Sequence, residues 1–152
     1  MRVWKAIALA SVMLTGSVEP ASTARCYIPV SVSEELQKSD AVFSGKVIAE
    51  EYRPLKTSAA QGEVLTVRIA VEKWWKGGKS EEVTLYTSGI RYSGGITSFE
   101  DEDFLFSLGE RYLVYASGSS DSLRTNGCRR TKKLGLADED LQKLGEGKAP
   151  EK

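Results

Sequence analysis

Cys26 and Cys128 carry the most specific chemistry in this 152-residue sequence. Two cysteines in a chain exported to an oxidising compartment most simply form one disulfide. The bond would close a loop of about 102 residues. In the chain-entropy model, closing a loop of that length stabilises the fold by about 4.7 kcal/mol. Two free thiols, or a bridge to another molecule, are the alternatives.

The absence of histidine removes many of the common catalytic and metal-binding arrangements. Neither a Ser–His–Asp nor a Cys–His centre can be built, and two cysteines are too few for a thiolate zinc site. Residues 100–103 (EDED) are rich in carboxylates but lack the glycine-punctuated spacing of a calcium loop. No carboxylate pair stands out for glycoside hydrolysis. We therefore predict a non-enzymatic protein with no catalytic residue, no cofactor and no metal site of its own.

Trp74 and Trp75 are candidate ligand-stacking residues, because an indole can stack on a sugar ring or a nucleobase. Adjacent residues of a strand point to opposite faces, so one of the two indoles belongs to the core. The net charge of +0 argues against nucleic acid, since binders of polyanions normally carry a basic excess. The basic residues 129–133 (RRTKK) could contact an acidic partner, although a solvated segment is the simpler interpretation.

Residues 1–24 have the pattern of a secretory signal peptide. Arg2 and Lys5 precede the apolar residues 6–18, and small residues follow at 21–24. The apolar run is shorter than the roughly 20 residues that a membrane-spanning helix needs. We therefore expect a secreted or cell-envelope protein with no integral membrane segment after cleavage; a retained N-terminal anchor is the alternative. Residues 25–145 then form one domain, followed by a disordered polar tail over residues 146–152.

Periodicity predicts a mainly β domain with a short helix at each end. Ser31 and Glu34 form a capping box for the first helix, and Gly45 marks a bulge or bend in the first strand. The predicted strands cover residues 41–50, 63–75, 82–87, 111–116 and 123–125, and the second helix covers residues 138–144. Residues 88–103 are predicted to form a long loop. Five strands favour a five-stranded OB-fold barrel, with a β-sandwich as the competitor.

The order and spacing of several stretches resemble the bacterial branch of the tissue-inhibitor-of-metalloproteinases (TIMP)-like and netrin-like (NTR) domains. The stretches that carry the resemblance are residues 26–29 (CYIP), 34–36 (EEL), 39–47 (SDAVFSGKV), 71–77 (VEKWWKG), 82–85 (EVTL), 108–116 (LGERYLVYA), 125–128 (TNGC), 130–131 (RT) and 140–145 (DLQKLG). Together they span nearly the whole chain after the predicted signal. The resemblance implies an OB-fold barrel with a disulfide-tethered N-terminal arm.

In the inhibitory members of that family, the α-amine and carbonyl oxygen of the first cysteine chelate the catalytic zinc of a protease. Transferred to this sequence, Cys26 is the zinc-directed residue, and Tyr27 and Ile28, followed by Pro29, form the protease-contacting arm. The chelate requires a mature protein that begins at Cys26, since Arg25 would occupy its amine. Ile28 stands where the family has its second cysteine.

Two hypotheses about function follow. The first is a secreted TIMP-like domain that acts by protein–protein contact, with a zinc metalloendopeptidase as the partner that the resemblance implies. The second is a non-inhibitory module of the cell envelope that binds glycan or protein or serves adhesion. That module would use the exposed tryptophan of the pair together with residues 88–103.

Overall fold

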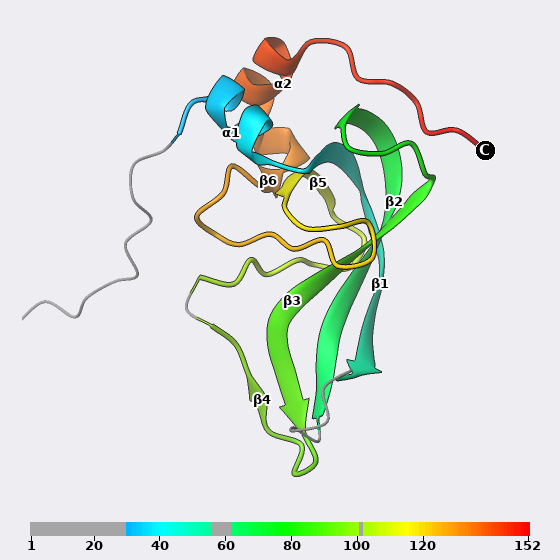
Figure 1. The fold of residues 1–152 in the computed structure, drawn as a ribbon, viewed down its shortest axis with the longest axis vertical. Coiled ribbons are helices and arrows are strands. Elements are labelled where there is room, and N and C mark those ends of the chain that lie inside the picture. The colour runs from blue at the N-terminus through cyan, green and yellow to red at the C-terminus, as the bar shows by residue number, and fades with distance from the viewer. Residues whose placement is uncertain (1–29, 56–61, 101) are drawn as a thin grey trace, which may run out of the picture.

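The computed structural model describes residues 30–55, 62–100 and 102–152. Six antiparallel strands form one sheet in the order β4-β3-β2-β1-β5-β6, and the sheet curls into a half-barrel. Two short helices lie together at one end of it (Figure 1). The elements are α1 (Val32–Lys38), β1 (Ala41–Pro54), β2 (Gly62–Lys76), β3 (Glu82–Tyr92), β4 (Thr97–Ser98), β5 (Arg111–Ala116), β6 (Lys132–Lys133), the 3-10 turn η1 (Leu134–Leu136) and α2 (Asp138–Leu144).

The predicted capping box begins α1. The Ser31 hydroxyl accepts a hydrogen bond from the Glu34 backbone N–H at 3.3 Å, and the Glu34 carboxylate accepts one from the Ser31 backbone N–H at 3.0 Å. Both bonds satisfy backbone donors that have no partner inside a helix. A seven-residue helix is marginal by itself, so packing must also hold α1. Val32 and Glu35 supply that packing with buried side chains.

The curl of the sheet follows from the bulged pairing of β1 with β2. The register shifts between Ser44 and Gly45, as predicted for a bend at this glycine. A Cβ atom on Gly45 would lie only 2.4 Å from the carbonyl oxygen of Ala70 on β2. The two backbones can therefore approach as they do only because residue 45 has no side chain. On its other side β1 pairs with β5 from Ala41 to Lys46.

The predicted fifth strand, at residues 123–125, is not a strand of the sheet. Arg124 pairs with Ser117 through an isolated bridge, and the Tyr86 N–H of β3 donates to the Leu123 carbonyl at 2.8 Å. The segment thus spans from β3 to the end of β5 without forming a ladder. Turns at residues 119–122 and 126–129 leave too few residues between them for regular pairing. A five-stranded barrel is therefore not what the sheet shows, and a single sheet rules out the two-sheet sandwich for the described residues.

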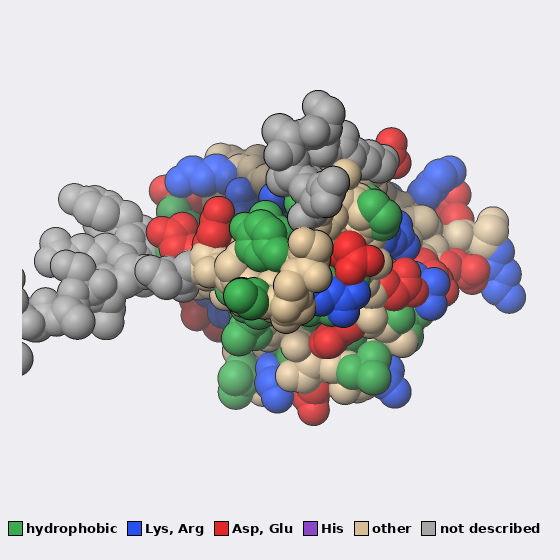
Figure 2. All heavy atoms as spheres, turned by 90° about the horizontal axis from the view of Figure 1, so that it is seen from below, with side chains coloured by type: hydrophobic (Ala, Val, Ile, Leu, Met, Phe, Trp, Pro, Cys, Tyr) green, Lys and Arg blue, Asp and Glu red, His purple; other side chains and the backbone are tan. Residues whose placement is uncertain are grey.

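The predicted loop at residues 88–103 is partly sheet. β3 continues to Tyr92 and pairs with β4, with Ile90 opposite Ser98 and Arg91 opposite Thr97. The Tyr92 N–H donates to the Ile96 carbonyl at 2.9 Å and closes the hairpin. Seen from below, basic and acidic side chains are mixed over the described part of this end of the molecule (Figure 2). That mixture matches the balanced composition of the chain.

The core has two parts because β1 and β5 are buried on both faces. Inside the curl lies the larger cluster, which includes Phe43, Ile69 and Tyr112. On the outer face a second cluster, built on Val42, Leu113, Tyr115 and Ala137, packs beneath α2 and η1. None of the helices in the described part of the chain has the length and apolar character needed to span a bilayer.

Residues 146–152, where we predict a disordered tail, run along the end of β2. Lys148 and Trp74 exchange two backbone hydrogen bonds of 2.8 Å as an antiparallel bridge. Further on, the Glu151 N–H donates to the Lys79 carbonyl at 2.7 Å, and the two side chains form an ion pair at 2.8 Å. The polar composition of this segment does not reveal these contacts, because most of them are made by the backbone and all of them join distant parts of the chain.

Candidate functional site: an anchor below the N-terminal arm

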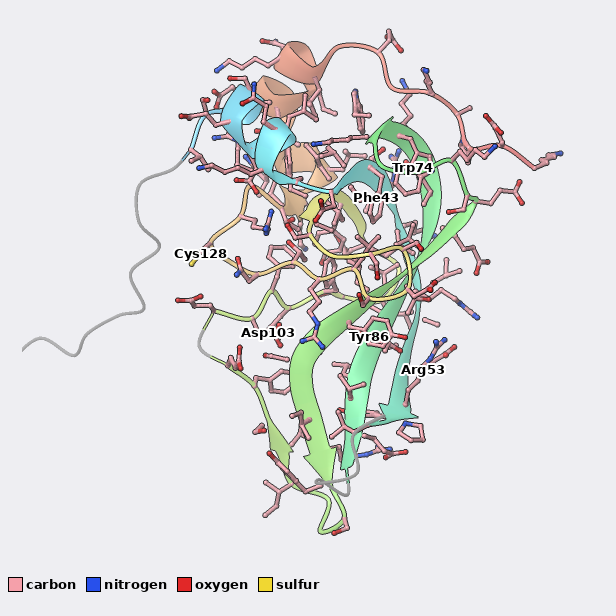
Figure 3. All side chains as sticks on the ribbon, in the orientation of Figure 1. Phe43, Arg53, Trp74, Tyr86, Asp103 and Cys128 are labelled. Atoms are coloured by element: carbon pink, nitrogen blue, oxygen red, sulfur yellow. The ribbon has the colours of Figure 1, made fainter. Side chains whose placement is uncertain are left out.

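The residues that follow Cys128 hold the chain where it enters the domain. The Cys128 N–H donates to the Asn126 side chain at 3.1 Å, which fixes the turn in which the cysteine lies. Two residues later, the Arg130 guanidinium donates from Nη1 to the Val30 carbonyl at 2.9 Å. Val30 is the residue directly after the predicted arm. Figure 3 shows Cys128 on the side of the molecule where the chain enters α1.

Arg130 belongs to a buried group of charges centred on Asp140, which we call the Asp140 cluster (Tyr115, Arg130, Lys132 and Asp140). Asp140 lies on α2 and is 0% exposed. Arg130 donates to its two carboxylate oxygens at 2.8 and 2.9 Å. Lys132 donates at 2.8 Å and the Tyr115 hydroxyl at 2.9 Å. Every member comes from a different turn or element, so the cluster joins β5, β6 and α2.

The electrostatics of the Asp140 cluster favour the ionised carboxylate. Burial by itself would raise the pKa of Asp140, but the hydrogen bonds from Arg130, Lys132 and Tyr115 outweigh it and lower the pKa to about 2. The bonds to Asp140 raise the pKa of Arg130 despite the opposing effect of burial. Burial, followed by the bond to Asp140, raises the pKa of Tyr115. At neutral pH the cluster is therefore a charged carboxylate held by two cations and a neutral phenol.

Arg129 makes a second set of contacts, to the helix that follows the arm. Its guanidinium donates to the Glu35 carboxylate at 3.0 Å and to the Ser39 hydroxyl at 3.4 Å, and it also bonds to the Ser117 hydroxyl. Glu35 is buried on α1, and Ser39 caps the end of that helix. Arg129 thus ties α1 to the end of β5, while Arg130 ties Val30 to α2.

The basic run at residues 129–133 is therefore not a solvated segment, and that interpretation is wrong for its first four residues. Arg130 keeps 13% of its side-chain surface exposed and Lys132 keeps 27%. The sequence signal that could have revealed this is the alternation of Arg130 and Lys132. In an extended segment such alternation places both side chains on one face. Their acceptor, Asp140, lies on a later helix, and local patterns do not pair residues at such a separation.

The arm itself, Cys26, Tyr27, Ile28 and Pro29, lies outside the described residues, as does the predicted signal at residues 1–24. The Cys26–Cys128 disulfide accordingly stays a prediction. What the structure does describe is the base of the arm, from Val30 onward. Among the described residues, no three His, Cys, Asp or Glu side chains are grouped so that they could hold a metal ion.

The tryptophan pair divides between the two faces of the sheet. Trp74 is only 4% exposed, packs against Phe43 with ring centroids 4.9 Å apart, and donates its indole N–H to the Ser80 carbonyl at 2.9 Å. It belongs to the core, so its prediction as a ligand-stacking residue is wrong. Trp75 is half-buried on the other face and donates to the Gly145 carbonyl at 2.9 Å.

The loop that we paired with the tryptophans lies elsewhere. Trp74 is near the helical end of the sheet, whereas β4 lies at the opposite end (Figures 1 and 3). Residues 88–103 and the tryptophans therefore do not form one site. Within the loop, Asp103 accepts a hydrogen bond from the Ser88 N–H at 3.4 Å, and the Ser88 hydroxyl accepts one from the Glu100 N–H at 3.0 Å. These bonds give the acidic residues a local structural role.

Comparison of the chain with protein-family models and with characterised proteins finds no match.

Proposed function

We propose that this chain is an exported TIMP-like domain that binds a partner protein through its N-terminal arm, residues 26–29. The observation that carries the proposal is the bond between Arg130 and the Val30 carbonyl, backed by the Asp140 cluster. It fixes the first residue after the arm to the body of the domain. Fixing the residue from which an arm extends reduces the conformational freedom that is lost on binding, which favours affinity.

The fold that we propose is of the OB type, with the resemblance to TIMP-like and NTR domains as its basis. The strongly curled antiparallel sheet supports this assignment. The segment that carries Leu123 and Arg124 supports it too, because it links β3 to β5 across the opening of the half-barrel. We interpret this segment as a reduced form of the strand that would close a five-stranded barrel.

The specific activity that we propose is inhibition of a zinc metalloendopeptidase. A catalytic zinc keeps one coordination position open for water or substrate, and a neutral amine with a neighbouring carbonyl oxygen can occupy it. Cys26 would supply both groups, and Tyr27 and Ile28 would enter the adjoining substrate cleft. The predicted bond from Cys26 to Cys128 would place the arm next to the turn that Arg129 and Arg130 hold against the domain.

The experiment compares two mature proteins that differ only in whether Arg25 precedes Cys26. Both are released from a cleavable tag and assayed against several zinc endopeptidases, with a serine protease as the control enzyme. We expect inhibition only of the zinc enzymes, and at least about 100-fold weaker inhibition by the form with Arg25, as expected when one of the two chelating groups is blocked. Equal inhibition by the two forms, with equal melting temperatures, would contradict the chelation mechanism. Sequencing the N-terminus of the exported protein shows which form exists.

A further inference from the structure

A hollow on the outer face of the sheet lies where α2 meets the end of β2. Its volume is about 730 Å³. The side chains that surround it come from β2, β5, η1 and α2, so four elements contribute to one concave surface. They include Trp75, Leu134, Leu141 and Gln142, together with the charged residues Glu72, Lys73, Arg111 and Glu146.

Trp75 gives this hollow an aromatic wall with a fixed orientation. Its indole N–H is bonded to the Gly145 carbonyl at 2.9 Å, so the ring cannot turn without losing that bond. Leu134 and Leu141 add apolar surface and pack against the same outer cluster as Trp75. Gly147 packs against the ring at Cε2 and Cζ2, since a Cβ on residue 147 would lie 2.9 and 3.1 Å from these atoms. The rest of this half-buried ring is oriented in advance and offers an apolar contact at little cost in conformational entropy.

The charged residues at the rim cancel one another. Arg111 donates from Nε to the two carboxylate oxygens of Glu72 at 2.9 and 3.1 Å, and these bonds raise the pKa of Arg111. Lys73 pairs with Glu146 at 3.3 Å. The lining therefore has no net charge to select an ion. It still presents donors and acceptors, because a guanidinium has five N–H groups, a carboxylate accepts several bonds, and Gln142 carries an amide.

We propose that this hollow binds a neutral sugar ring of a glycan, with Trp75 as the stacking residue and Gln142 as a hydrogen-bonding residue. A pyranose has an apolar face of C–H groups and a rim of hydroxyls, which is the complement of one indole surrounded by neutralised polar groups. A pocket with mostly apolar walls and a few convergent polar groups is the usual form of a small-ligand site. The site does not depend on the N-terminal arm, so it stands or falls separately from protease inhibition.

The test is titration of the exported protein with chitotriose and cellotriose, followed by nuclear magnetic resonance of the two indole N–H groups. We expect the Trp75 signal to shift while that of the core residue Trp74 stays in place. One ring in an open hollow supports a Kd of about 0.1–1 mM. Gln142→Ala should weaken binding about three- to tenfold through loss of one hydrogen bond. Trp75→Ala should abolish binding.

The matched control is Gln37→Ala, an exposed glutamine on α1 away from the lining of the hollow. It should leave the affinity unchanged. No shift of either indole up to about 20 mM sugar, well above the expected Kd, would overturn the proposal. The proposal would also be overturned if the folded Gln142→Ala variant bound the sugars with the affinity of the wild type. Tighter binding of N-acetyl-phenylalaninamide than of either sugar would assign the hollow to an aromatic side chain of a protein partner instead.

Discussion

Replacement of Asp140 by asparagine tests whether the Asp140 cluster holds the domain together. The substitution keeps the size of the side chain but removes its charge, and it places an N–H₂ group among donors. Arg130 and Lys132 then face each other without their shared carboxylate, in surroundings where they are 13% and 27% exposed. Breaking a buried ion pair by removing one partner typically costs about 3–5 kcal/mol. Since Lys132 and Arg130 keep some access to water, we expect a loss of about 3 kcal/mol.

Urea unfolding and thermal melting measure this loss. A change of about 3 kcal/mol corresponds to a drop of roughly 10–15 °C in melting temperature for a domain of this size. Asp138→Asn is the control, because Asp138 lies exposed in the first turn of the same helix. It should cost less than about 1 kcal/mol, the most that a surface charge near a helix terminus usually contributes. A loss below about 1 kcal/mol for Asp140→Asn would refute the stabilising role of the cluster.

The free energy of unfolding at acidic pH provides an independent measure of the bonds to Asp140. The pKa of Asp140 is lowered from 3.8 to about 2 in the folded protein, so the folded state binds its proton less readily than the unfolded state. The stabilisation of the folded state that results from this difference in pKa is fully present above pH 3.8 and is lost as the pH falls to about 2. Its size is about 2 kcal/mol. The gap in stability between wild type and Asp140→Asn should therefore narrow by that amount between pH 7 and pH 2.

Three further predictions concern the rest of the fold. Cys128→Ser should lower the free energy of unfolding by about 2–5 kcal/mol if Cys26 is its partner, and alkylation of both thiols in native, unreduced protein would contradict the disulfide. Gly77→Ala should cost at least about 2 kcal/mol in denaturant unfolding, because residue 77 has φ +81° and an added Cβ would lie 2.0 Å from a backbone oxygen. Gly135→Ala, which meets open space, should leave the unfolding midpoint unchanged. Truncation after Gly145 should lower the melting temperature and make Trp75 fluorescence more accessible to quenchers, because it removes Gly147, which packs against the Trp75 ring. An unchanged melting temperature and unchanged quenching would show that the tail neither stabilises the domain nor covers Trp75.

Sequence patterns predicted the features that depend on residues close together in the chain. The capping box of Ser31 and Glu34 and the bend at Gly45 are confirmed, because a helix start and a close backbone approach leave a mark within a few residues. The pair Trp74 and Trp75 divides between the two faces of the sheet, as strand geometry requires. Only the structure could show which indole is buried, since bulges in β1 and β2 shift the phase of the alternation.

The sequence could not reveal the contacts that form between distant segments. Arg130, Lys132 and Asp140 look like ordinary surface charges until β5 and α2 bring them together. The segment with Leu123 and Arg124 falls short of a strand because tertiary position, and not β-propensity, decides whether a neighbouring edge is available. In the same way, Lys148 can pair with Trp74 only because the β2 backbone is unpaired on one side at this point. The amino-acid composition of the tail does not predict that.

The helix α2 is the element on which both proposed sites depend. Successive residues of a helix are rotated by about 100°, so Asp140 and Gln142 present different faces of the same seven-residue element. Asp140 faces inward to the charges that hold the base of the arm, while Leu141 and Gln142 line the hollow beside Trp75. A helix this short has little stability of its own, so these two sets of contacts hold it in place. The sites therefore share one scaffold, yet their contacting side chains differ, and a substitution at Gln142 can weaken a ligand in the hollow without touching the arm.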